Sequence, residues 1–272
     1  MENKTSILNT SDSEHTLQER PRIACLVSYW AFTRSHADWI ICKLLDGYWW
    51  QGAHTPSRVE VVSVYIHQLE ESPLGQKVCK AKNIPIFKTP AEAVTLGGTE
   101  LAVDGVVIIG EHGNYPTDLQ GRWLLPRWWI YHQVIQVFQK SKRSVPVFND
   151  KHLSYNWDEA RWMFDKQNEH VVVSMLGMPG PFSQYHAAND LPHWITEMMV
   201  SKKEPFNAER LLLSTGITNQ FNESNWENGR FSAFGRRIET PFLNISYRTT
   251  RGPLFNKGER PPDRPYIRGF DQ

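Results

Sequence analysis

Six short apolar runs alternate with amphipathic stretches between residues 22 and 178. The runs cover residues 22–29, 59–66, 84–87, 103–110, 144–149 and 170–176. Each run is continuously apolar and rich in β-branched residues, as expected of strands that are buried on both faces of a sheet. Strands that alternate with helices in this way form parallel sheets linked by crossover helices. The pattern therefore predicts an α/β fold with a doubly wound, mainly parallel sheet.

Several of the connecting segments have the spacing of apolar residues that is typical of helices. Residues 36–47 place their apolar side chains on one side and end at Gly47, which suits the C-terminus of a helix. The same spacing predicts helices over residues 127–141 and 154–167.

The two ends of the chain differ from this pattern. Residues 1–21 contain few apolar side chains, and residues 257–272 are rich in proline and arginine. Neither segment can bury enough apolar surface to offset the entropy lost on ordering. We therefore expect a disordered tail at 1–21 and a flexible tail at 257–272.

The alternation of strands and helices stops after residue 180. Residues 211–217, 230–235 and 242–250 suggest a few antiparallel strands. The sequence therefore predicts a sheet domain at 22–180, followed by a small α+β appendage at 181–256.

Charge and cysteine content exclude several classes of protein. Lys and Arg number 30 and Asp and Glu 29, so the net charge of +1 favours neither nucleic acid nor an acidic membrane as a partner. The three cysteines are widely spaced in apolar surroundings, which favours reduced, buried thiols over disulfides or a zinc site. No apolar run reaches the roughly 18 residues of a membrane span, and we find no signal peptide. We expect a cytoplasmic protein with a small-molecule substrate and leave a homo- or hetero-oligomer open.

Polar residues gather where the predicted strands end. Ligands of open α/β sheets bind beyond the carboxyl ends of the strands. Any one of these residues is more often a helix cap or a surface group, but three clusters on one edge favour a site. The predicted catalytic residues are His36, Glu111, His112, Asp150 and Lys151. The predicted substrate-binding residues are Arg34, Asp38, Asn114, Tyr115, Asn149 and His152.

Asp150 and Lys151 suggest proton transfer. Adjacent side chains in a strand face opposite sides, but a turn at the strand end can direct both into the crevice. A desolvated lysine loses affinity for its proton, so Asp150 would act as a base and Lys151 as a proton donor or an electrostatic clamp. A metal site built from Glu111, His112, Asp150 and His152 is an alternative. No ligand motif such as HExxH supports it, and we predict no metal.

Residues 144–164, SVPVFNDKHLSYNWDEARWMF, carry a family resemblance. Residues 22–178 resemble the Rossmann-type nucleotide-binding domain of the glucose-fructose oxidoreductase and inositol dehydrogenase family. In that family the fifth strand ends in Glu-Lys-Pro, and Asp150, Lys151 and His152 take these three places here. The resemblance implies that Lys151 lies beside the nicotinamide and the substrate. The chain also resembles uncharacterised bacterial proteins with His-Ala-Asp, Glu-His-Gly and Asp-Lys-His motifs.

The first strand is not followed by the glycine-rich motif of that family. The chain has SYWAFTRSHAD at this position, without one glycine and with the bulky Tyr29, Trp30 and Phe32. We therefore expect a cofactor-independent acid/base enzyme, of the elimination (lyase) or isomerase type, that acts on a small polar, anionic metabolite. The alternatives are an NAD- or NADP-dependent oxidoreductase of the family above, and a non-catalytic or partner-completed subunit of an oligomer.

Overall fold

The computed structural model describes most of the chain. The described residues are 19–32, 35–169, 172–175, 184–205, 207–227, 230–231 and 235–247. Residues 1–18 of the first expected tail and all of the second lie outside this part of the chain.

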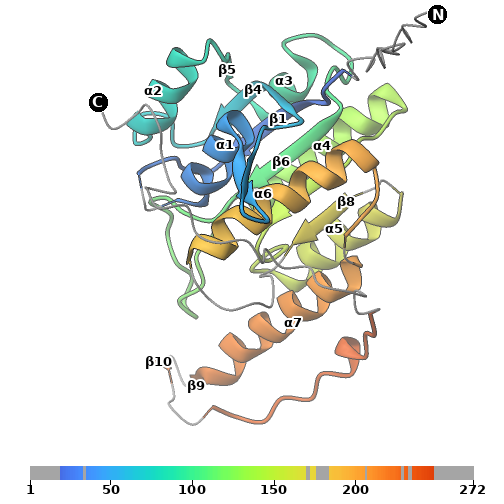
Figure 1. The fold of residues 1–272 in the computed structure, drawn as a ribbon. Helices are drawn as coiled ribbons and strands as arrows, with labels where there is room; N and C mark the ends of the chain where they lie inside the picture. Colours follow the sequence, from blue (N-terminus) through green and yellow to red (C-terminus); the bar gives the residue numbers. More distant parts are fainter. Residues whose placement is uncertain are drawn as a thin grey trace, which may run out of the picture.

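A six-stranded parallel sheet forms the centre of the molecule, with the strand order β5-β4-β1-β6-β7-β8 (Figure 1). Every one of these strands lies in or at the edge of a run that the sequence predicts, and the predicted α/β class is confirmed. The strands are β1 (Arg22–Val27), β4 (Glu60–Ile66), β5 (Ile86–Phe87), β6 (Gly105–Ile109), β7 (Val147–Asp150) and β8 (Val172–Met175).

Helices cover both faces of the sheet, as a doubly wound fold requires. Successive side chains of a strand point to opposite faces, so Cys25 of β1 packs in one core cluster and Leu26 in the other. The first cluster lies under α1 (His36–Asp46), α2 (Pro73–Ala81) and α6 (Gln184–Ser201). The second lies under α3 (Pro90–Thr95), α4 (Arg127–Ser141), α5 (Trp157–Glu169) and α7 (Ala208–Asn225). In Figure 1, α1 and α6 lie in front of the sheet and α4 and α5 behind it.

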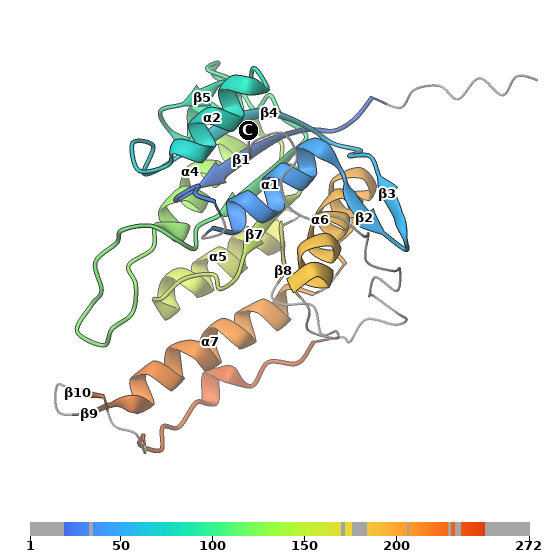
Figure 2. The same ribbon diagram turned by 60° about the vertical axis from the view of Figure 1, so that its left-hand side comes forward.

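The chain changes direction across the sheet between β1 and β6. After β1 the chain enters α1 on one face, whereas after β6 it passes through residues 110–126 into α4 on the other. Neighbouring strands whose connections leave to opposite faces open a crevice at their carboxyl ends, the topological switch point. The loop 110–126 extends from this edge and is drawn in green in Figure 2.

The region after residue 180 is more helical than the sequence suggests. Residues 211–217, expected as a strand, lie within α7, because Leu211, Leu212 and Thr215 recur at helical spacing on its buried face. The only antiparallel pair in this described region is the short β9 (Trp226–Glu227) with β10 (Arg230–Phe231), and Pro241–Leu243 forms a 3-10 helix. The predicted domain boundary near residue 180 stays a prediction.

A short hairpin follows α1 and was not predicted. Strands β2 (Tyr48–Trp50) and β3 (Ala53–Thr55) pair through Gln51 and Gly52, whose φ values of 52° and 83° suit a tight hairpin turn. The hairpin packs against α6, where the ring of His193 stacks on that of Trp50 at 3.6 Å between centroids.

The cysteines agree with the sequence-based expectation. Cys25, Cys42 and Cys79 are free and buried. Among the described helices, none combines the length and the apolar character that crossing a membrane requires.

Candidate functional site

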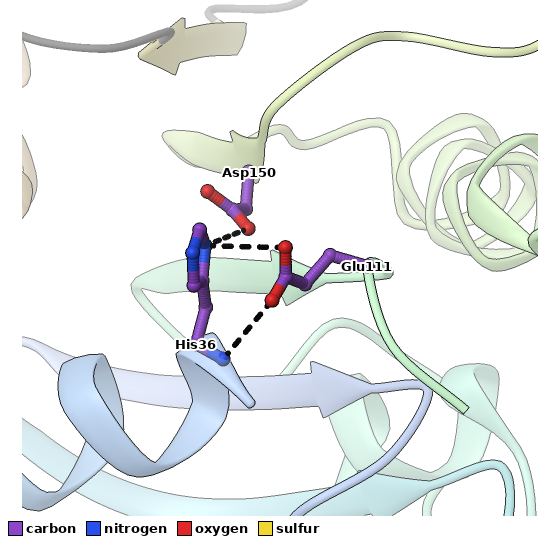
Figure 3. Close-up of side chains that lie close together, drawn as sticks. All are labelled: His36, Glu111 and Asp150. Carbon is purple, nitrogen blue, oxygen red and sulfur yellow. Dashed lines mark hydrogen bonds and ion pairs between the residues drawn. The ribbon is translucent and has the colours of Figure 1, made fainter. Parts of the chain in front are cut away.

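Three side chains from distant parts of the chain meet at the switch point (Figure 3). His36 begins α1, Glu111 follows β6 and Asp150 ends β7. Their possible ligand atoms all lie within 4.8 Å of one another. The carboxyl groups of Glu111 and Asp150 are 2% and 3% exposed, whereas the imidazole of His36 is 30% exposed. Two buried acids therefore face a histidine that the solvent can reach.

The imidazole of His36 is held by Asp150. The Nδ1 atom of His36 lies 2.7 Å from Oδ2 of Asp150 and 3.6 Å from Oε2 of Glu111. A neutral imidazole that carries its proton on Nδ1 donates this short bond to the ionised Asp150. The Nε2 atom of His36 is then the basic nitrogen. The arrangement can accept a proton from a ligand and stabilise the imidazolium that results.

Lys151 completes the cluster through an unusual backbone conformation. Its φ is +61°, in the left-handed region that residues other than glycine seldom adopt. This turn places the Lys151 ammonium against the Glu111 carboxylate, although Asp150 precedes it and faces the same crevice. Burial lowers the pKa of Lys151 below its ordinary value. The sequence-based expectation that both neighbours turn toward one crevice agrees with this geometry.

His112 lies on the other side of the Glu111 carboxylate. Its Nε2 atom is 3.3 Å from Oε1 of Glu111, and its ring centroid is 6.4 Å from that of His36. Burial, followed by the nearby His36, lowers the pKa of His112. The hydroxyl of Ser28, at the end of β1, donates to the backbone carbonyl of His112 at 2.6 Å. This bond fixes the start of the loop 110–126 against the sheet.

A second anchor holds the same loop to the end of β4. Gln68 accepts from the backbone N–H of Asn114 at 2.8 Å and donates to its carbonyl at 2.9 Å. Tyr115 lies beside His67, with its hydroxyl 2.6 Å from Nδ1 of that histidine. A Cβ atom on Gly113, which has φ +137°, would lie 2.4 Å from Oε1 of Gln68, so this close approach requires glycine.

A crevice of about 470 Å³ opens beside His112. Pockets of this size hold small ligands. Its lining residues are Tyr29, Glu71, His112, Gly113, Asn114 and Trp123. Tyr29 and Trp123 contribute aromatic faces and Glu71 a carboxylate, and the sequence analysis assigned none of the three to the site.

The remaining predicted binding residues lie in different places. Asn149 is fully buried and donates from Nδ2 to the backbone carbonyl of His152 at 3.3 Å. Asp38 is 2% exposed, and its carboxylate accepts a hydrogen bond from the Cys42 thiol within α1. Its role in substrate binding stays a prediction. Arg34 lies outside the described residues.

The cluster contains a positive charge of its own, the Lys151 ammonium. His36, Glu111 and Asp150 offer three ligand atoms to a cation, but the Lys151 ammonium already contacts Glu111. The metal site considered from the sequence included His112 and His152. Neither belongs to the group of residues whose ligand atoms lie within 4.8 Å of one another. The absence of a metal stays a prediction.

Comparisons with known proteins identify relatives by fold alone. No family model matches the chain. No curated protein matches it either.

Several solved structures match part of the chain. GenD2 from gentamicin A biosynthesis, in complex with NAD, is 18% identical, with a TM-score of 0.37 over 59% of this chain and 35% of its own. The apo scyllo-inositol dehydrogenase from Lactobacillus casei is 10% identical, with a TM-score of 0.38 over 59% of this chain and 37% of its own. The WlbA dehydrogenase from Bordetella pertussis, in complex with NADH and UDP-GlcNAcA, is 18% identical, with a TM-score of 0.33 over 56% and 36%.

The sheet domain resembles the Rossmann-type domain of inositol dehydrogenases and their relatives. The resemblance stated from the sequence is confirmed at the level of the fold. The matched part spans little more than a third of each of these proteins, 35% to 37% of their length.

The comparisons correct two predictions. We expected a cofactor-independent lyase or isomerase, but the matched proteins are dehydrogenases. We expected no cofactor, but two of the matched structures contain NAD or NADH. The alternative named from sequence, an NAD(P)-dependent oxidoreductase, agrees better with these findings. The expectation of a cofactor-independent enzyme rested on the bulky residues of the first loop. It assumed that a bound dinucleotide must lie over this loop.

The first loop lacks the glycine-rich motif of a dinucleotide-binding domain. Glycine-rich loops bring the pyrophosphate onto the N-terminus of the first helix. Here the backbone N–H of His36, at that N-terminus, donates to Oε1 of Glu111 at 3.3 Å. The side chain of Trp30 fills the same connection and is fully buried. The aromatic residues that a nicotinamide ring could contact, Tyr29 and Trp123, lie instead in the lining of the crevice beside His112.

Proposed function

We propose that the chain is an NAD(P)-dependent oxidoreductase that acts at a hydroxyl or carbonyl group of a small polar molecule. The observation that carries this proposal is the His36–Asp150 pair, 2.7 Å apart at the topological switch point. A buried acid that orients a partly exposed imidazole is the arrangement expected of a proton acceptor for a hydroxyl group.

The chain supplies the proton-transfer half of this reaction. A nicotinamide bound in the crevice would accept or donate the hydride. As the substrate alcohol becomes a carbonyl, its hydroxyl proton passes to Nε2 of His36, and Asp150 stabilises the imidazolium through Nδ1. In the reverse direction His36 returns this proton to the carbonyl oxygen.

Lys151 and Glu111 support this transfer electrostatically. The Lys151 ammonium lies at the same edge as His36 and is fixed there by its contact with the buried Glu111. A positive charge held in a partly desolvated site stabilises negative charge that develops on the reacting oxygen. Burial lowers the pKa of Lys151, so the ammonium can also exchange its proton more readily than an exposed lysine.

Titration with NADH and NADPH tests this function directly. The chain has 11 tryptophans, among them Trp123 in the wall of the crevice, so bound nicotinamide should quench their emission by energy transfer. We expect saturable binding with a Kd on the order of 1–100 μM. Trp123→Leu should weaken this binding, while Trp162→Leu, which alters a tryptophan of α5 outside the crevice lining, should leave it unchanged. Absence of saturable binding of both cofactors to the wild-type protein would contradict the proposal.

A further inference from the structure

Arg127 is a buried cation to which the proposed function gives no role. It is the first residue of α4 and is 5% exposed. Within the part of the chain that the structure describes, its guanidinium makes neither a hydrogen bond nor an ion pair, and its Nε atom is buried without a partner. A buried N–H donor without a hydrogen-bond partner is unfavourable, and buried charges in proteins are normally paired.

The Arg127 side chain packs against a glycine, Gly110. A Cβ atom on Gly110, which follows β6, would lie 2.5 Å from Cγ of Arg127. The stem of Arg127 therefore packs directly over Gly110, the residue before Glu111. Gly110 lies at the carboxyl end of β6, and β6 is the direct neighbour of β7, which ends at Asp150. Burial lowers the pKa of Arg127 to about 10, and the charge of Asp150 opposes this shift.

His152 lies two residues after Asp150, at the same edge of the sheet. Its Nδ1 atom is buried and has no hydrogen-bond partner among the described residues. Burial, and then the charge of Arg127, lower the pKa of His152 to about 4, so its ring is neutral at pH 7. A neutral imidazole offers one N–H donor beside the guanidinium. Two buried polar groups without partners, on different elements, therefore lie near the His36–Asp150 pair.

We propose that Arg127, assisted by His152, binds a carboxylate group of the substrate. The inference rests on the proposed function and extends it, because it makes the substrate a small hydroxy acid or the corresponding oxo acid. A carboxylate matches the planar fork of a guanidinium and completes its missing hydrogen bonds. The hydroxyl group of the same small molecule would then lie near His36, since Arg127 packs on Gly110 and the next residue, Glu111, contacts His36.

The surrounding charges favour a carboxylate over a phosphate. Asp150 and Glu111 are buried carboxyl groups at the same edge of the sheet. Lys151 compensates the charge of Glu111, but Asp150 repels an incoming anion, and a dianion is repelled more strongly than a monoanion. One arginine with one neutral histidine compensates a single negative charge.

Calorimetric titration without any nicotinamide cofactor tests this site. The probes are glycolate, its neutral analogue glycolamide, and inorganic phosphate. We expect glycolate to bind with a Kd on the order of 1 mM, at least about 10-fold more tightly than glycolamide or phosphate. Arg127→Met should lose glycolate binding by about 10-fold or more. The exposed Arg161→Met, which removes an arginine paired with Asp165 on α5, is the matched control and should bind glycolate as the wild type does.

The stability of the ligand-free protein gives an independent measurement. Methionine fills the volume of Arg127 without a buried charge, so Arg127→Met should unfold at the same temperature as the wild type or higher. A lower unfolding temperature would indicate a structural role for Arg127 and would overturn the proposal. Equal binding of glycolate and glycolamide to the wild-type protein would also overturn it, without recourse to any variant. Tighter binding of phosphate would refute the carboxylate class.

The two titrations distinguish a failure of the oxidoreductase proposal from a failure of the carboxylate-site proposal. Glycolate binding that depends on Arg127, in a protein that binds neither NADH nor NADPH, would support the anion site and refute the oxidoreductase. NADH binding without glycolate binding would support the oxidoreductase and refute the anion site.

Discussion

Asp150 Oδ2 and His36 Nδ1 lie 2.7 Å apart, although 114 positions separate the two residues in the chain. Parallel topology creates this contact: Asp150 is the last residue of β7, and His36 is the first of the helix that follows β1. The strand between them, β6, ends just before Glu111, which contacts His36 as well. The sheet therefore fixes the distance between acid and imidazole without a flexible linker.

Replacing Asp150 by Asn should reduce turnover more than substrate binding. The amide keeps the shape of the side chain but does not stabilise an imidazolium at His36, so we expect kcat to fall by about 100-fold to 10,000-fold. The measurement is the rate of NADH formation or loss with the hydroxy or oxo acid that the binding experiments identify. Asp165→Asn, on the exposed side of α5, is the control. A kcat for Asp150→Asn within a few-fold of the wild-type value would refute the role of the pair.

Because Lys151 has a left-handed backbone conformation, glycine should be more stable than alanine at this position, the reverse of the usual order within a helix. Both Lys151→Ala and Lys151→Gly remove the contact with Glu111, but only glycine adopts φ +61° without steric cost. We expect Lys151→Gly to be more stable than Lys151→Ala by about 1 kcal/mol, measured by urea unfolding. The same pair of substitutions at Lys166, within α5, should give the opposite order, because glycine destabilises a helix interior. Equal stability of the two Lys151 variants would contradict the prediction.

The half-buried ring of His193 should make the fold less stable in mild acid. Burial, and then the charge of Arg58, lower its pKa from 6.5 to about 4. Between these values the unfolded chain binds more protons than the folded one, so stability is full above pH 6.5 and falls as the pH drops toward 4. After solvent screening of this partly exposed ring, we expect a loss on the order of 1 kcal/mol.

The check is the free energy of unfolding as a function of pH for His193→Phe, which keeps a ring against Trp50. This variant should lose part of the slope between pH 6.5 and 4, whereas His54→Gln, on the same hairpin, should keep it. An unchanged slope in His193→Phe would assign the acid sensitivity to other groups.

Gly216 should resist replacement by alanine although it lies within a helix. A Cβ atom there would come within 2.3 Å of Leu243 Cδ2 and 2.7 Å of Trp157 Cζ3. Helix propensity alone favours alanine by about 1 kcal/mol. Overpacking should outweigh it, so we expect a net loss of about 1–3 kcal/mol in urea unfolding. Ser214→Ala, on the same helix, is the control and should change stability by less. If Gly216→Ala were more stable than the wild type, the side chains of Leu243 and Trp157 would be able to move aside without loss of stability, and the prediction would be wrong.

The sequence predicted the sheet and much of the cluster because both depend on local patterns. Continuous apolar runs mark buried strands, and the ends of parallel strands necessarily meet at one edge, so Glu111 and Asp150 could be placed together. The sequence was therefore sufficient to predict that His36, Glu111 and Asp150 lie close together, while their roles stay predictions.

The other features of the fold and the site depend on contacts between distant parts of the chain, which local sequence patterns do not predict. Arg127 follows Pro126 at the start of α4, and its packing on Gly110 at the end of β6 joins two distant parts of the chain. Asp38 was assigned to the site by proximity in the sequence, and its bond with Cys42 within α1 could not be read from that proximity. The run Leu211–Leu213 has strand-like composition, yet packing of α7 against α5 favours a helix.

The reciprocal hydrogen bonds between Gln68 and Asn114 divide the loop 110–126 into two parts with different tolerance to change. The part before Asn114 carries Glu111 and His112 and is fastened to the ends of β1 and β4. The part beyond it has its own bridge between Thr117 and Trp123 and an ion pair between Asp118 and Arg122. Insertions near the exposed Leu119 should therefore leave the acid and the imidazoles in register, so that the outer part can vary in length and shape while the proton-transfer geometry stays constant.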